Sequence, residues 1–113
     1  MKIVHQDQTE KLKNSETCFA TEYPLGDKDI NGAIIELTGR YPDKGRVVNL
    51  ECKEMSYVIK GSGKVAVEDK AINLKEGDLI LIEPKEKYFW EGSLTLFVAC
   101  SPAWRPEQHQ ITE

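Results

Sequence analysis

The strongest structural signal in the chain lies in residues 54–65, which read EMSYVIKGSGKV. Strand-forming apolar residues run through 55–60, and a second short run covers 64–67. Gly61 and Gly63 lie between these runs, and glycine supplies the positive φ that a tight hairpin requires. The stretch therefore predicts two strands joined by a turn at the glycines.

The same alternation of short strands and turns continues on both sides of this stretch. Further apolar runs occur at residues 17–23, 33–38, 47–52, 79–82, 88–90 and 94–100. Turns are expected at residues 68–70 and 75–78, where charged residues and a glycine interrupt the pattern. No window keeps the helical i, i+3, i+4, i+7 spacing for long. The chain is therefore predicted to be all-β, with strand spacing that favours a sandwich or a barrel.

The two ends of the chain differ from this pattern. Residues 5–16 are almost wholly polar and cannot supply a buried face, so we expect a loose N-terminal arm. The expected organisation is an arm with a first short strand over 1–31, a β-barrel over 32–104 and a tail over 105–113. Two prolines end strand pairing near the tail, and Trp104 provides a large hydrophobic anchor. We expect the tail to cover a barrel surface, its own or a partner's.

The composition excludes several functional classes. A chain of 113 residues fits one domain with one modest core. Its 15 Lys and Arg and 19 Asp and Glu give a net charge of −4 and are interspersed, which argues against a nucleic-acid partner. The longest aliphatic run, residues 79–82, is far below the roughly 20 apolar residues that span a bilayer, so we expect no membrane segment and no signal peptide. Three cysteines without a CxxC pair indicate a reducing, cytoplasmic location.

Two motifs give the chain a resemblance to a known family. Residues 54–65 resemble the end of the first cupin motif, in which a glutamate precedes a Tyr-Val-Leu-like strand and a Gly-x-Gly turn. Residues 74–84, LKEGDLILIEP, resemble the second motif, in which a Gly-Asp turn leads into an apolar strand and a proline. The matching parts cover roughly residues 32–100. The resemblance implies a single-domain jelly-roll β-barrel with a site inside its mouth, and it implies a homodimer as the expected assembly.

The metal-binding histidines of that family are missing here. Members of the family bind the metal through two histidines just before the motif glutamate and a third shortly after the motif proline. Glu54 keeps the glutamate position, but residues 47–53 contain no histidine and Tyr88 holds the last ligand position. The chain has only His5 and His109. Because one carboxylate cannot hold a divalent metal tightly, we predict no metal and no cofactor, with rescue by a cysteine or the tail histidine left open.

The candidate ligand-binding residues are Glu54, Tyr88, Asn49 and Trp90. The motif position directs Glu54 inward, where it could bind a hydroxyl or amine, or act as a general acid or base if burial raises its pKa. The alternative is an exposed or ion-paired carboxylate. Tyr88 and Trp90 share one strand face, either as core or as the wall of an organic-ligand pocket. Asn49 could reach the cavity, or it could satisfy a neighbouring backbone group.

We therefore predict a metal-independent protein that binds a small polar organic molecule, such as a sugar or a related metabolite, inside the barrel. One alternative is an enzyme, either a sugar isomerase or epimerase or a dioxygenase-like protein with a non-standard metal site. Another is a structural or sensory dimerisation module. Cys52 and Cys100 are expected to be buried small hydrophobes. His109 is expected in a solvated tail, with folding back over the barrel mouth as the alternative.

Overall fold

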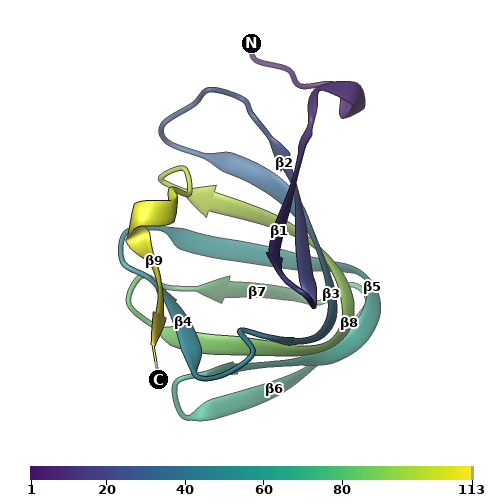
Figure 1. Cartoon of the computed structure of the whole chain (residues 1–113), viewed down its shortest axis with the longest axis vertical. Helices are drawn as coiled ribbons and strands as arrows, with labels where there is room; N and C mark the ends of the chain where they lie inside the picture. Colours follow the sequence, from purple (N-terminus) through teal and green to yellow (C-terminus); the bar gives the residue numbers. More distant parts are fainter. Residues whose placement is uncertain (113) are drawn as a thin grey trace.

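The computed structural model describes residues 1–112, which form one antiparallel β-sheet curled into a barrel (Figure 1). The strands are β1 (Glu10–Ser15), β2 (Cys18–Tyr23), β3 (Asn31–Tyr41), β4 (Arg46–Asn49), β5 (Lys53–Val67), β6 (Lys70–Lys75), β7 (Leu79–Ile82), β8 (Lys87–Ser101) and β9 (His109–Thr112). Two short 3-10 helices, η1 (Gln6–Gln8) and η2 (Pro106–Gln108), complete the described elements. No helix in this part of the chain is long and apolar enough to cross a membrane. The all-β barrel predicted from the sequence is confirmed.

The two longest strands, β5 and β8, form the centre of the sheet. Strand β8 pairs with β3 along one edge and with β5 along the other. Its even-numbered side chains from Tyr88 to Cys100 are buried, except at Gly92, because successive side chains on a strand point to opposite faces. These side chains pack with Val58 and Val65 of β5 to form the core.

The turn expected at Gly61 and Gly63 is not present, and that prediction is wrong. Strand β5 continues through both glycines and pairs with β8 along its whole length. A Cβ atom on either glycine would collide with the backbone of β8, at Ser93 and Glu91 respectively. The glycines therefore allow two bent strands to approach closely, which is the other common role of glycine in a strand. The turns predicted at residues 68–70 and 75–78 are confirmed.

The N-terminal segment is more ordered than its composition indicated. Residues 10–15 form β1, which pairs antiparallel with β2, so the expected loose arm is wrong for this part of the chain. The strand is held by backbone hydrogen bonds while its side chains are mostly exposed. A strand of this kind shows no alternation of apolar and polar residues, which is why the sequence pattern missed it.

The C-terminal segment returns to the barrel as a strand. Strand β9 pairs antiparallel with β4, with His109 opposite Asn49, and lies beside it in Figure 1. Trp104 packs against the core of the same barrel. The tail therefore covers its own barrel, one of the two surfaces expected for it. Residue 113 lies outside the described residues.

Candidate functional site

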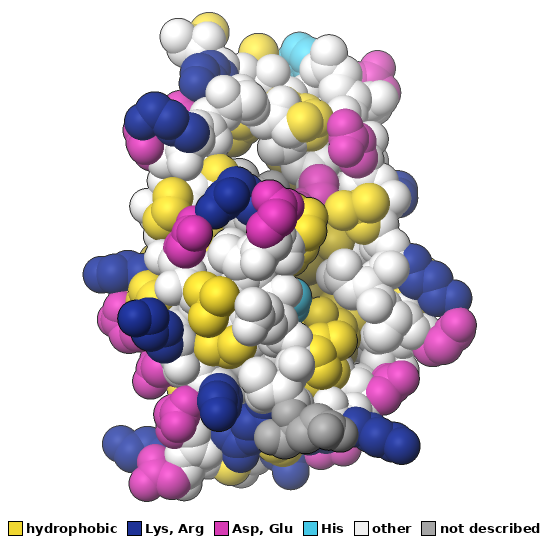
Figure 2. Space-filling view, turned by 60° about the vertical axis from the view of Figure 1, so that its left-hand side comes forward, with side chains coloured by type: hydrophobic (Ala, Val, Ile, Leu, Met, Phe, Trp, Pro, Cys, Tyr) yellow, Lys and Arg dark blue, Asp and Glu magenta, His cyan; other side chains and the backbone are white. Residues whose placement is uncertain are grey.

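A cavity of about 150 Å³ lies inside the barrel mouth, enclosed by the β1–β2 hairpin, β3, β8 and the C-terminal segment. Its lining is mainly apolar. Its polar groups include the carboxyl group of Glu54, the hydroxyls of Tyr41 and Tyr88, and the imidazole of His109. On the face drawn in Figure 2, hydrophobic side chains are exposed in a hollow, and charged side chains of both signs surround them. A concave, mainly apolar space with a few convergent polar groups is typical of a small-molecule site.

Glu54 points into this cavity and is only 9% exposed. The phenol of Tyr88 donates to its Oε2 at 3.4 Å, and the Asn49 amide donates to its Oε1 at 3.5 Å. Burial raises the pKa of Glu54 from its ordinary value of 4.5 to about 7, although these hydrogen bonds and one from the Cys100 thiol lower it. Glu54 is therefore a buried carboxyl group that changes its protonation near neutral pH, and the exposed, ion-paired alternative is wrong.

Asn49 is fully buried but is not among the residues that line the cavity. Its Nδ2 donates to Tyr88 Oη at 3.2 Å as well as to Glu54. Its Oδ1 accepts from Gln108 Nε2 at 3.1 Å and from His109 Nδ1 at 2.8 Å. Asn49 therefore binds side chains rather than a backbone group, and it links the Glu54–Tyr88 pair to the C-terminal segment.

His109 is part of this network, so the expectation of a solvated tail histidine is wrong. Because the Asn49 oxygen only accepts, His109 Nδ1 carries a proton. Burial lowers the pKa of His109, which favours the neutral ring, and its Nε2 then accepts from the hydroxyl of Tyr41 at 3.1 Å. Trp104 packs beside the imidazole with ring centroids 5.4 Å apart. Burial also raises the pKa of Tyr41 to about 12, so its phenol remains protonated.

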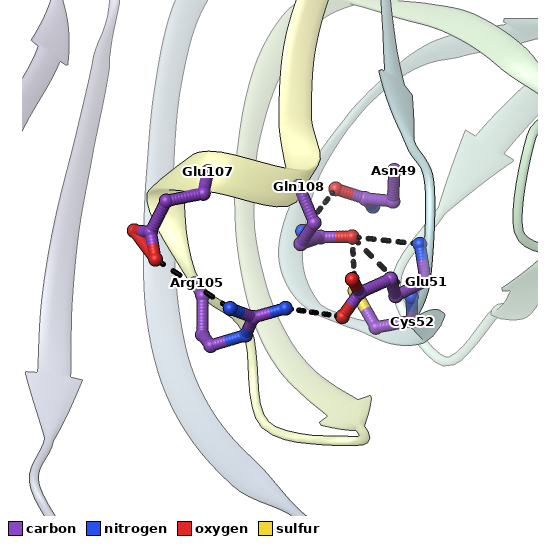
Figure 3. Close-up of polar contacts among 6 residues, drawn as sticks. All are labelled: Asn49, Glu51, Cys52, Arg105, Glu107 and Gln108. Carbon is purple, nitrogen blue, oxygen red and sulfur yellow. Dashed lines mark hydrogen bonds and ion pairs between the residues drawn. The ribbon is translucent and has the colours of Figure 1, made fainter.

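Gln108 fixes the C-terminal segment to the barrel (Figure 3). Its side chain is buried, and its Oε1 accepts from the backbone amides of Glu51 and Cys52 at 3.1 and 3.3 Å. Arg105 pairs with Glu51 on the surface, where an ion pair is worth little. The buried hydrogen bonds of Gln108 are thus the main polar attachment of the segment that carries His109.

The aromatic side chains at the start of β8 lie on both faces of the strand. Tyr88 and Trp90 are buried and meet edge to face with ring centroids 6.5 Å apart, and both line the cavity. Phe89 lies on the opposite face under the guanidinium of Arg40. As predicted, Cys52 and Cys100 are buried and free, and Cys100 lines the cavity.

The residues near Glu54 do not fit the metal site that the motifs imply. Within residues 1–112, no group of three or more His, Cys, Asp or Glu side chains is arranged to hold a metal ion. The groups in contact with the Glu54 carboxyl are an amide, a phenol and a thiol, and the amide and the phenol also bind each other. First-row metals in such barrels prefer imidazole and carboxylate ligands.

Comparison with known proteins gives one family and a set of similar folds. A family model described as the EutQ-like cupin domain matches residues 41–98. No curated protein matches the chain. Among solved structures, the nucleoside dehydratase Pac13 from Streptomyces has a TM-score of 0.89 at 17% identity, over 100% of this chain and 92% of Pac13.

Two further structures have the same architecture. An RmlC-like cupin from Shewanella frigidimarina has a TM-score of 0.75 at 19% identity, over 93% of each chain. Ectoine synthase from P. lautus has a TM-score of 0.75 at 12% identity, over 100% of this chain and 91% of that enzyme. At these sequence identities the similarity shows a shared fold alone.

Proposed function

This chain belongs to the EutQ-like cupin domain family, and we propose that it binds a small polar organic molecule in its barrel cavity without a metal. The observation that carries the proposal is Glu54, a buried carboxyl group that faces the cavity and whose hydrogen-bond partners are all uncharged. Burying such a group is costly, and it is commonly retained where it binds or reacts.

The cavity lining indicates the chemistry of the ligand. Glu54 can accept a hydrogen bond from a ligand hydroxyl as a carboxylate, or donate one as a carboxylic acid, because its pKa of about 7 permits both forms. The indoles of Trp90 and Trp104 provide flat apolar walls. A ligand with hydroxyl or amide groups and a planar or ring-shaped body, such as a sugar or a nucleoside, suits this combination. A structure of a Pac13 variant contains uridine, which supports including nucleosides among the candidates.

A second candidate function is an enzyme that transfers protons, and the Tyr41–His109–Asn49 arrangement favours it. The Tyr41 hydroxyl donates to Nε2 of the neutral His109 ring at 3.1 Å, and His109 Nδ1 donates to the Asn49 Oδ1, which orients the ring, at 2.8 Å. This is the order of groups that activates a hydroxyl in many enzymes. Glu54 faces the same cavity, so two groups that can exchange protons line it. One could remove a proton from a ligand carbon while the other protonates the opposite face of the same carbon, another carbon, or a departing hydroxyl that leaves as water. The corresponding reactions are epimerisation, isomerisation and dehydration.

Thermal-shift measurements with a panel of sugars and nucleosides test the proposal. A ligand that binds only the folded state raises the melting temperature. We expect at least one compound to stabilise the chelator-treated wild type and Glu76→Gln, a control in an exposed turn, but not Glu54→Gln. Equal stabilisation of Glu54→Gln would remove Glu54 from the binding site. Turnover of that compound, lost in both Glu54→Gln and His109→Phe, would select the enzyme over the binding protein.

A further inference from the structure

The lining of the barrel cavity contains acidic side chains but no permanently basic ones. Among the described residues that line it, Glu22 and Glu54 are acidic and none is a lysine or an arginine. His109 does not offset these carboxyl groups, because burial lowers its pKa and favours the neutral ring. A charged ligand that enters the cavity therefore meets carboxyl groups of the protein and no cationic side chain.

Glu22 is the second carboxyl group of the cavity, and it lies on a different strand from Glu54. It stands opposite Ala33 of β3, which in turn stands opposite Val98 of β8, and all three side chains line the cavity. Glu22 is half-buried, and burial together with the charge of Glu10, its direct neighbour on β1, raises its pKa. No hydrogen bond or opposite charge from residues 1–112 offsets this shift. Glu22 therefore lacks a positive partner, as Glu54 does.

Aromatic side chains surround the same space. Four of them line the cavity: Tyr41, Tyr88, Trp90 and Trp104. The face of an aromatic ring attracts a cation, and proteins recognise substituted ammonium groups with several such rings around one cavity. The cavity volume of about 150 Å³ suits a body the size of a benzene ring. The lining thus combines the two kinds of group that bind a small organic cation.

We propose that the ligand of the cavity is a small organic cation, an amine or a substituted ammonium compound, whose positive charge is balanced by Glu22 and Glu54. This inference rests on the proposed function, because it specifies the ligand that the cavity binds. A cation supplies the opposite charge that both carboxyl groups lack, and it gains from the aromatic walls as well. A neutral ligand leaves the carboxyl groups unpaired, and an anionic ligand is repelled by them.

Titration calorimetry with matched probes tests the charge of the ligand. The pairs are choline and its neutral analogue with carbon in place of nitrogen, benzylamine and benzyl alcohol, and glucosamine and glucose, with glucuronate as the anion. We expect at least one cation to bind at least about 10-fold more tightly than its neutral partner, and glucuronate not to bind. Equal affinity within every pair would overturn the inference and leave the proposed function standing.

A matched pair of variants tests the part played by Glu22. Glu22→Gln should lose most of the preference for the cation, and its affinity for the neutral partner should be unchanged. Glu36→Gln is the control, because Glu36 lies on the neighbouring strand β3 between two residues of the cavity lining and is itself exposed on the outer side. It should bind both probes as the wild type does. Equal preference in the two variants would contradict the role of Glu22.

The titration of Glu54 gives a readout that does not depend on affinity. A cation nearby favours the carboxylate, so saturating choline should move the midpoint of Glu54 well below its value of about 7 in the free protein. The neutral analogue should not move it. A neutral sugar or nucleoside that binds while no cation does would overturn the inference alone. Failure of every cation, sugar and nucleoside to bind would overturn the proposed function together with it.

Discussion

The first residues of β5 carry opposite chemistry on their two faces. Inside the barrel, Glu54 and Ser56 are buried, whereas Met55 and Tyr57 between them are exposed on the outside. Further along the same strand the usual order returns, with Val58 and Val65 in the core. This reversal of the usual order is confined to the start of the strand, where Glu54 lines the cavity. Burying polar groups costs stability, so the inner face indicates a binding role.

Two neighbouring residues of β8, one on each face of the sheet, should differ most in their contribution to the free energy of unfolding. Leu96 is buried in the core, and its neighbour Phe97 lies on the outer side of the sheet. Leu96→Ala should lower the free energy of unfolding by about 3 kcal/mol because it leaves a cavity. Phe97→Ala should cost less, about 1 kcal/mol, since its side chain is already 40% exposed in the folded chain. Urea unfolding of both variants measures the two losses. Equal losses would contradict the opposite orientation of the two side chains.

The next effect is a pH dependence caused by Glu54. Its pKa is about 7 in the folded chain and 4.5 without burial, so the folded state binds the extra proton between these values. The stability from this proton is complete below about pH 4.5 and is lost as the pH rises to about 7. Relative to wild type, Glu54→Gln should be as stable at low pH and more stable at pH 8, by up to about 3 kcal/mol.

Unfolding curves at several pH values measure this difference. The exposed control Glu76→Gln should follow the wild type throughout. A Glu54→Gln variant that tracks the wild type at every pH would show that Glu54 is hydrated, and the inversion on β5 would then disappear.

The smallest effect concerns Ser56. Its side chain is completely buried, and within the described chain its hydroxyl has no hydrogen-bond partner. Replacing it with alanine removes a desolvated hydroxyl, so Ser56→Ala should raise the free energy of unfolding by up to about 1 kcal/mol. Ser62→Ala, at an exposed position, should have almost no effect. A marked loss of stability in Ser56→Ala would mean that the hydroxyl makes a hydrogen bond. Burying the polar inner face would then lower the free energy of unfolding by less than inferred.

The fold could be predicted because its strands and turns are encoded locally. The alternating residues of β8 and the turns at 68–70 and 75–78 follow from neighbours in sequence. The glycines at 61 and 63 were misleading because one residue type serves both tight turns and close strand contacts, and only the partner strand decides between them. Strands β1 and β9 have no buried face to produce a pattern.

The candidate site was only partly predictable. Glu54, Tyr88 and Trp90 follow from motif position and strand alternation. His109 does not, because its partner Tyr41 is 68 residues away and the contact depends on the pairing of β9 with β4. Nothing local in the polar tail sequence indicates that pairing. Trp104 was the one signal that the segment returns to the barrel.

The proposed function requires Glu54 to be a buried carboxyl group that faces the cavity and binds no metal. Carbon-13 NMR of side-chain carboxyl groups as a function of pH tests it directly. We expect one glutamate resonance with a midpoint near pH 7, absent from the Glu54→Gln spectrum and unchanged by a chelator. A Glu54 midpoint near 4.5 would contradict the buried carboxyl group, and a midpoint that moves on chelation would contradict the metal-independent site.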